Sequence, residues 1–282
     1  MGAERARRPK DRSPKRDRAW RSGEVKRGSI VVVGTGIKAV AQTTLEAVAC
    51  IRRAERVFYV VDEPVTERWI RRLNPTAESL DQYYAEGKPR HKTYKEMADR
   101  LVATVRAGVD VCAVFYGHPG IVVDTSHEAI RRLRRAGFPA RMLPGISTED
   151  CLLADLNVDP TTTGCQSFEA TDFLAGRRRF DPSSMLILWQ VGALGEPSLH
   201  DRLPCRRERL EVLTSVLRRF YAAKHRIALY EAAQFPACRP VVRWIRLAEL
   251  PRTRIWPVMT VYIPPAYERA DDPRIMRWFD EN

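Results

Sequence analysis

Residues 81–94 (DQYYAEGKPRHKTY) bring tyrosines and cations together between two segments that are expected to be helical. Phenol and guanidinium groups can donate hydrogen bonds to negative charge that develops in a reaction, provided that their positions are fixed in advance. Loops between regular elements often carry such groups. A surface loop with aromatic packing explains the same residues. The segment therefore indicates a candidate catalytic site but does not identify the reaction.

A second stretch with a chemical signature is Tyr116-Gly-His-Pro-Gly120, which directly follows the apolar run of residues 109–116. That run is rich in β-branched and aromatic residues and is typical of a strand buried on both faces of a parallel sheet. In open α/β sheets, ligands bind beyond the carboxyl ends of strands. Two glycines allow the backbone to approach a ligand closely. A simple strand-to-helix turn is the alternative for this stretch.

The elements that must position these two stretches alternate between strands and helices. Apolar β-branched runs indicate strands, and apolar residues at helical spacing indicate helices. The expected strands cover residues 29–37, 56–62, 109–116, 139–143, 165–168, 185–191, 226–230 and 257–263. The expected helices cover residues 41–51, 64–73, 93–107, 126–135 and 207–222, with a further helix that Ser147 or Thr148 can cap. This alternation predicts an α/β fold.

Composition limits the class of protein. The chain has 282 residues, of which 44% are hydrophobic, and a formal net charge of +13. Residues 1–27 hold eleven Lys and Arg against four acids, which predicts a solvated, disordered tail. No stretch is long and apolar enough to be a signal peptide or to span a membrane. The six cysteines and five histidines show no ligand spacing, so we expect a reducing cytoplasm and no structural metal.

The first expected turn contains a weak nucleotide-binding pattern. Gly34, Gly36 and Ala39 match the G-x-G-x-x-G/A dinucleotide fingerprint, and Asp62 follows at the distance of a ribose-binding acid. A nicotinamide-dependent oxidoreductase would fit this pattern. Glycines in the first turn of any nucleotide-type fold would look the same.

Three motifs occur together in order: Gly34-Thr-Gly36, Tyr116-Gly-His-Pro-Gly120 and Leu143-Pro-Gly-Ile-Ser147. In their order and spacing the chain resembles the tetrapyrrole-methylase class of S-adenosylmethionine-dependent methyltransferases. Within that class it most resembles the borosin peptide-backbone α-N-methyltransferases, over residues 28–265. The resemblance implies an α/β fold of two domains, 28–143 and 144–265, followed by a short tail, 266–282. It also implies a mostly parallel first sheet, a mixed second sheet and S-adenosylmethionine bound between them.

The resemblance also implies the roles of individual residues. Tyr84, Arg90 and Tyr94 match catalytic positions, while Asp81 stands where the family often has another tyrosine. The positions that match cofactor-contacting motifs are Tyr116, His118, Ile121, Val122, Ser147, Thr148 and Gln190.

The chemistry explains why such catalytic residues are needed. A peptide nitrogen is a poor nucleophile because its lone pair is delocalised into the carbonyl group. A phenol and a guanidinium can stabilise negative charge on the carbonyl oxygen. A second phenol, its pKa lowered by Arg90, can accept or relay the N–H proton.

The expected partners follow from the same resemblance. Fused borosin enzymes carry their substrate peptide on a long extension, whereas 17 residues follow Pro265 here, so we expect a separate precursor peptide. We also expect an interlocked homodimer, with Trp69 and Ile70 of the helix at 64–73 at the interface. No membrane is expected and nucleic acid is an unlikely partner. The alternatives are a methyltransferase of the same class acting on a tetrapyrrole or ribosomal RNA, and a catalytically silent peptide-binding module.

Overall fold

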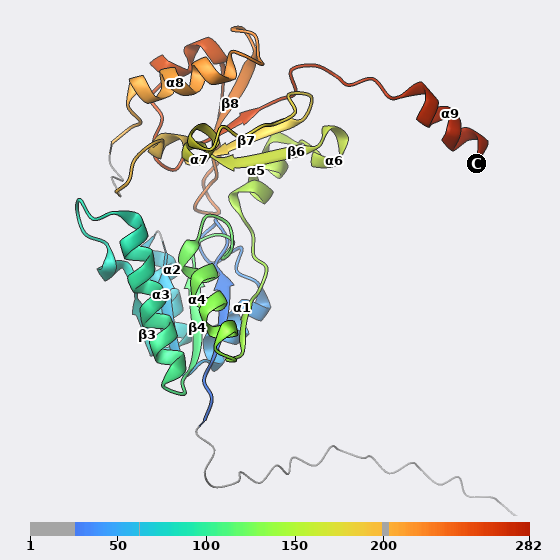
Figure 1. The fold of residues 1–282 in the computed structure, drawn as a ribbon. Helices are drawn as coiled ribbons and strands as arrows, with labels where there is room; N and C mark the ends of the chain where they lie inside the picture. The colour runs from blue at the N-terminus through green and yellow to red at the C-terminus, as the bar shows by residue number, and fades with distance from the viewer. Residues whose placement is uncertain (1–25, 62, 199–202) are drawn as a thin grey trace, which may run out of the picture.

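The computed structural model describes residues 26–61, 63–198 and 203–282. Two α/β halves lie one above the other, each built on a five-stranded sheet, and the C-terminal segment leads away from both (Figure 1). Nearly all of the expected basic tail, residues 1–25, lies outside the described residues, as does Asp62.

The first sheet is parallel throughout, with strand order β3-β2-β4-β1-β5. Its strands are β1 (Ser29–Gly34), β2 (Arg56–Val60), β3 (Ala77–Ser79), β4 (Asp110–Phe115) and β5 (Ala140–Met142). Helices α1 (Leu45–Arg53) and α2 (Pro64–Leu73) pack on one face, and α3 (Arg90–Arg106) and α4 (Asp124–Arg135) on the other. Because both faces are covered, β4 is buried on both sides, as its apolar run predicted.

The second sheet is mixed, with strand order β6-β7-β10-β8-β9. Strands β6 and β7 are parallel, and the other pairs are antiparallel. Its strands are β6 (Cys165–Glu169), β7 (Met185–Trp189), β8 (Arg226–Glu231), β9 (Val241–Arg246) and β10 (Thr260–Ile263). The other elements of this half are α5 (Thr148–Leu156), α6 (Pro160–Thr163), α7 (Ala170–Ala175), α8 (Arg207–Leu217), η2 (Val191–Ala193) and η3 (Leu247–Arg252). The expected combination of a parallel and a mixed sheet is confirmed.

An apolar cluster joins the two halves at the carboxyl ends of the first sheet. Ile37 and Tyr116 from the first half pack with Trp189 and Tyr230 of the second sheet. The backbone amide of Ala39 donates to the carbonyl of Gln234 at 2.7 Å, close to the same place. The loops that follow β1 and β4 are therefore enclosed between the halves.

Two expectations about helices are wrong. The helix expected at 93–107 begins at Arg90, so Arg90 and Tyr94 lie on its first turns rather than in a loop. On α2, Ile70 is completely buried in the core of its own half, and Trp69 packs against that same core. The buried side of α2 therefore stabilises its own domain, and Ile70 is not available for an interface.

The terminal helix α9 (Pro273–Glu281) was not expected from the sequence. It lies at the end of an extended segment, away from both sheets (Figure 1), and none of its residues is buried. Its exposed apolar side chains are Ile275, Met276, Trp278 and Phe279.

Candidate active site

The loops after β1 and β4 are joined by backbone hydrogen bonds between their glycines. The amide of Gly36 donates to the carbonyl of Gly117 at 3.3 Å, and the amide of Gly117 donates back at 3.0 Å. A Cβ atom on Gly34 would lie 2.1 Å from the carbonyl oxygen of Gly117, so only glycine fits there. Helix α1 begins at Leu45, well after these glycines, so the dinucleotide pattern lacks the helix N-terminus that it requires.

The loop after β4 forms one wall of a cavity and contains a residue with an unusual backbone conformation. His118 Nδ1 accepts a hydrogen bond from the amide of Gly120 at 3.0 Å. Val122 has φ +57°, a left-handed conformation that is rare for a β-branched residue. On the opposite wall, Gln190 has φ +55°. Strained residues of this kind gather at functional sites, where the surrounding structure maintains them.

The start of α5 supplies another part of the wall. Ser147 caps this helix: its hydroxyl accepts from the amides of Glu149 and Asp150, and the Asp150 carboxylate accepts from the Ser147 amide at 2.7 Å. The capping expected from the sequence is thus confirmed. The capping box fixes Ser147 and Thr148 at the edge of the cavity.

A cavity of about 620 Å³ lies between the halves, beyond the carboxyl ends of the first sheet. The structure brings every site residue singled out from the sequence to its wall. These residues are Tyr84, Arg90, Tyr94, Tyr116, His118, Ile121, Val122, Ser147, Thr148 and Gln190. Gly120, expected to leave space for a ligand, instead faces Met142 Sδ and His127, so its backbone approaches side chains behind the loop.

Tyr84, Arg90 and Tyr94 form the aromatic end of this cavity. The rings of Tyr84 and Tyr94 meet edge to face, with centroids 6.4 Å apart. Arg90 Nε is buried and has no hydrogen-bond partner among the described residues. A buried donor without an acceptor is costly, and a ligand carbonyl oxygen would satisfy it.

The expectation that Arg90 lowers the pKa of a phenol below its usual value is wrong. Burial raises the pKa of Tyr94, and the charge of Arg90 opposes this rise without cancelling it. Burial also raises the pKa of Tyr84. Hydrogen bonding between the phenols raises the pKa of Tyr84 further and opposes the rise at Tyr94, which is the pattern of Tyr84 donating to Tyr94.

The sequence analysis did not identify several carboxylates at the cavity wall. Asp124 begins α4, Glu149 lies on α5 and Glu231 ends β8. Burial raises the pKa of Glu149, and a hydrogen bond with Ser167 opposes that rise. The signal available for Asp124 and Glu149 was their position directly after the two glycine-containing loops. No local sequence signal identifies Glu231, because folding brings it to the cavity from a distant strand.

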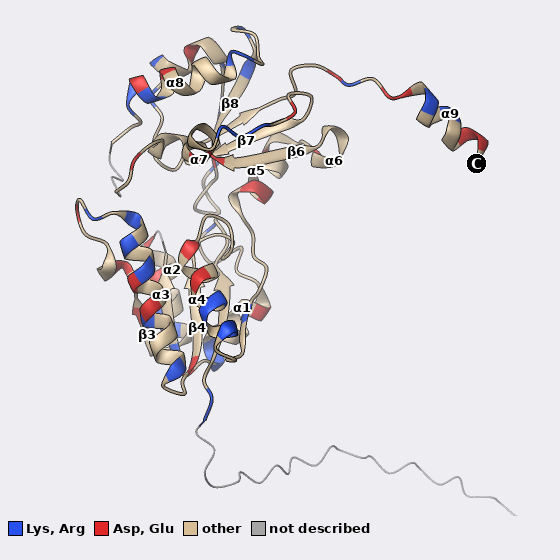
Figure 2. Cartoon of the chain, in the orientation of Figure 1, with Lys and Arg blue, Asp and Glu red and all other residues tan. Residues whose placement is uncertain are grey.

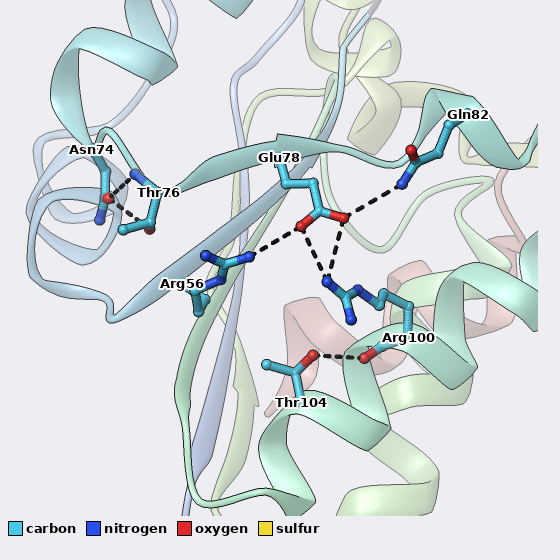
Figure 3. A network of polar contacts seen from close by, with 7 residues as sticks. All are labelled: Arg56, Asn74, Thr76, Glu78, Gln82, Arg100 and Thr104. Atoms are coloured by element: carbon cyan, nitrogen blue, oxygen red, sulfur yellow. Dashed lines mark hydrogen bonds and ion pairs between the residues drawn. The ribbon is translucent and has the colours of Figure 1, made fainter.

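A polar network outside the cavity holds the segment that carries Tyr84. Glu78 on β3 accepts hydrogen bonds from Arg56 on β2 and from Arg100 on α3, both at 3.1 Å (Figure 3). Gln82 of η1 (Asp81–Tyr83) donates to the same carboxylate at 3.4 Å. These hydrogen bonds connect the edge strand β3, η1 and α3. Tyr84 follows directly after η1.

The basic residues of α3 are interleaved with acids, whereas on α4 the acids Asp124 and Glu128 precede four arginines (Figure 2). Asp99 binds Arg132 at 2.6 Å and Lys95 at 3.0 Å. These helices therefore do not form a uniformly basic surface of the kind that follows a nucleic-acid backbone.

Within residues 26–61, 63–198 and 203–282, His, Cys, Asp and Glu side chains form no cluster of three or more that could hold a metal ion. In the same part of the chain no helix is long and apolar enough to span a membrane.

Comparison with known proteins gives relatives with long regions of similarity. A methyltransferase/ribosomally synthesized cyclic peptide gymnopeptides precursor from Gymnopus fusipes is 41% identical over 254 residues, which cover 89% of this chain and 60% of the relative. The corresponding omphalotin A precursor from Omphalotus olearius is 41% identical over 260 residues, covering 91% of this chain and 62% of the relative. The chain thus spans about three-fifths of the length of these relatives.

Solved structures share the fold at low sequence identity. Uroporphyrin-III C-methyltransferase from Thermus thermophilus superposes with a TM-score of 0.61 at 20% identity, covering 85% of this chain and 93% of that enzyme. A structure of the same enzyme complexed with S-adenosyl homocysteine gives a TM-score of 0.57 at 21% identity, over 84% of this chain and 92% of that enzyme. The model of the tetrapyrrole (corrin/porphyrin) methylases matches residues 29–237, so the chain belongs to that family.

Proposed function

We propose that the protein is an S-adenosylmethionine-dependent methyltransferase that methylates backbone amide nitrogens of a peptide. The observation that carries this proposal is the buried Arg90 Nε, which has no acceptor among the described residues and lies with two phenols in one cavity. Such a group of donors suits a carbonyl oxygen that gains negative charge. The relatives that are 41% identical are named as methyltransferases joined to cyclic peptide precursors, which supports a peptide substrate.

The cavity fits S-adenosylmethionine in place, size and charge. It lies beyond the carboxyl ends of a parallel sheet, where ligands of open α/β folds bind. Its volume of about 620 Å³ is within the range of small-molecule sites. Carboxylates of Asp124, Glu149 and Glu231 lie at its wall and favour a cationic ligand. When bound, S-adenosylmethionine supplies an electrophilic methyl group on a positively charged sulfur.

The protein's own residues activate the amide in this proposal. Arg90 binds the peptide carbonyl oxygen and stabilises its negative charge as the N–H proton leaves, while the Tyr84 hydroxyl donates to Tyr94. Tyr94, as phenolate, accepts that proton and becomes a neutral phenol, which later returns it to water. Tyr94 suits this role better than Tyr84, because Arg90 and the hydrogen bond from Tyr84 both favour the charged form of Tyr94.

A separate peptide is the substrate form that we propose. Among the described residues, those that line the cavity extend no further along the chain than Thr260, and α9 lies away from both sheets (Figure 1). Val60, Met97 and Val123 make the aromatic end of the cavity apolar, which favours peptides with apolar side chains.

The test is to incubate the protein with S-adenosylmethionine and short apolar peptides, and to look for methyl-sized mass increments. Tandem mass spectrometry must place the methyl group on a backbone nitrogen. The matched control is the same peptide with proline at the modified position, because proline has no backbone N–H to replace. Methylation of a tetrapyrrole or of RNA, with no reaction on any peptide, would contradict the proposal.

A further inference from the structure

The first turn of α3 is held by the other half of the molecule. This helix carries Arg90 and Tyr94, and no side chain caps its N-terminus. The amide of Arg90 instead donates to the carbonyl of Pro197 at 3.0 Å, and Pro89 forms an antiparallel bridge with Ser198. Because helix N-termini have amides without internal partners, an outside acceptor of this kind fixes the place of the first residue.

The segment that provides this acceptor is itself held by a side chain on α8. Arg209 Nη1 donates to the carbonyl of Leu194 at 2.9 Å and to the Glu196 carboxylate at 3.1 Å. The other oxygen of Glu196 accepts from the Ser198 hydroxyl at 3.2 Å. The side chains of Arg209 and Glu196 are only 29% and 20% exposed, so water competes weakly for these bonds.

We propose that Arg209 and Glu196 are positioning residues for methyl transfer, acting on Arg90 through the backbone of residues 194–198. This inference rests on the proposed function, because it takes Arg90 as the group that binds the substrate. Residues 190–198 run from the cavity wall at Gln190 and Ala193 to the first turn of α3. The Arg209–Glu196 pair therefore fixes the distance between the two sides of the cavity.

A small displacement of this segment has a large expected effect. Arg90 is the first residue of α3 and Tyr94 follows one turn later, so a shift of the helix start moves both groups together. Misplacing a reacting group by about 1 Å can lower a rate by about 100-fold. Ser147 and Thr148, at the start of α5, lie outside this segment. Gln190, another expected cofactor contact, stands at its beginning, ahead of the residues that Arg209 binds.

The experiment compares Arg209→Met with Arg207→Met in the full chain. Arg207 lies on the same helix and pairs with Glu211 at 2.8 Å, but the two side chains are 61% and 49% exposed, so that pair contributes little. Hydrogen exchange measured by mass spectrometry follows the peptide that contains the Arg90 amide. Single-turnover methylation of an apolar peptide and titration with S-adenosylhomocysteine are measured on the same proteins.

In Arg209→Met we expect faster exchange at the start of α3, unchanged exchange in its later turns and a rate lower by about 10- to 100-fold. S-adenosylhomocysteine affinity changes by no more than about threefold, since Arg209 binds Leu194 and Glu196, Gln190 precedes those residues, and Ser147 and Thr148 lie on another element. Arg209→Lys keeps a donor near Glu196 and recovers part of the rate, and Arg207→Met behaves as wild type.

Two results would overturn the inference: unchanged exchange at the start of α3 in Arg209→Met, or a full rate despite faster exchange. A wild-type protein that methylates no peptide is a different result. It would contradict the proposed function, while faster exchange in Arg209→Met would still show that the pair holds the helix start.

Discussion

The rings of Tyr84 and Tyr94 are nearly perpendicular, at 89°, yet the two phenols are not electrostatically equivalent. Burial raises the pKa of both. The charge of Tyr94, Asp81 and the hydrogen bond to Tyr94 raise the pKa of Tyr84 further, and Arg90 is the smallest influence there, opposing the rise. At Tyr94 the charge of Arg90 is the largest influence after burial, and it opposes the rise together with the hydrogen bond from Tyr84, while Asp124 adds to the rise. Tyr94 therefore ionises before Tyr84, and the proton removed from a substrate amide is expected to go to Tyr94.

The pH dependence of methylation follows from this shift. The usual pKa of tyrosine is about 10 and burial raises that of Tyr94, so the phenolate fraction grows about tenfold per pH unit from pH 7 upward. We expect the single-turnover rate to rise in the same way, with no plateau below about pH 10. A plateau near pH 7 would contradict the role of Tyr94.

Folding stability is expected to respond to the same ionisation in the opposite direction. Burial raises the pKa of Tyr94 in the folded protein above its value of about 10 in the unfolded chain. The contribution of Tyr94 to folding stability is therefore fully present below about pH 10 and is lost as the pH rises through the folded-state pKa. Thermal melts between pH 8 and pH 11 (roughly the range around the tyrosine pKa) check this, and they show whether a fall in rate at high pH comes from unfolding.

Tyr94→Phe removes one hydroxyl and keeps the ring that packs against Tyr84. Because the proton acceptor is lost, we expect methylation to slow by about 100- to 1,000-fold. Cofactor affinity is expected to change by less than about threefold, because Tyr94 lies on α3 and not on the cofactor-side loops. Single-turnover rates and calorimetric titrations separate the two effects. Normal turnover would show that residues 81–94 are a surface segment with aromatic packing and have no catalytic role.

Arg90→Lys keeps the positive charge and removes the planar fork of donors. A lysine ammonium cannot replace Nε at the place where the structure leaves it buried without a partner. We expect a rate loss of about 100-fold with the pH profile of the wild type, since Tyr94 remains. Rates measured across the pH range decide this: a lost pH dependence would contradict Tyr94 as the proton acceptor.

How far the sequence predicts this molecule can be seen from particular elements. Helix α2 occupies residues 64–73 as expected, because Pro64 at its first position and Glu63 as its cap are local signals. Edge strand β9 was missed, since Val241 and Val242 are both exposed and the strand shows no clear alternation of apolar and polar residues.

The site shows the same division between local and long-range information. The glycine-containing loops were recognised from short motifs, and their residues meet at one cavity. The start of α3 at Arg90 depends on Pro197, a contact more than a hundred residues away that no local pattern encodes. The charge of Arg90 was expected to lower the pKa of one of the phenols. Burial by tertiary packing outweighs that charge.

The contact between the first and second glycine motifs leads to a further prediction. A Cβ atom at position 34 would lie 2.1 Å from the Gly117 oxygen and 2.8 Å from Pro119 Cδ. Gly34→Ala therefore displaces the loop that carries His118 and Ile121 to the cavity, and we expect S-adenosylhomocysteine affinity to fall by at least tenfold, about 1.4 kcal/mol.

The control for this substitution is Gly137→Ala. Gly137 has φ +77° and open space around its Cβ position, so alanine there costs only backbone strain, about 1–2 kcal/mol of folding stability. Thermal melts and calorimetric titration are run on both variants, with circular dichroism to confirm folding. A folded Gly34→Ala protein with wild-type affinity would show that the loop after β4 does not bind the cofactor.

Homodimer formation is a prediction that now depends on α9 rather than on α2. Helix α9 exposes Trp278 at 58% and Phe279 at 61%, next to Ile275 and Met276, at the end of a segment that leads away from the body (Figure 1). An amphipathic helix with no residue buried against the described part of its own chain is a typical interaction surface. We expect a dimer at micromolar concentration by light scattering, and a shift to monomer in the double variant Trp278→Asp, Phe279→Asp.

Leu45→Asp, which changes a 90% exposed residue on α1, is the matched control and stays dimeric. If the wild-type protein is a monomer and still methylates peptide at full rate, the active site is complete within one chain and the dimer expectation is wrong.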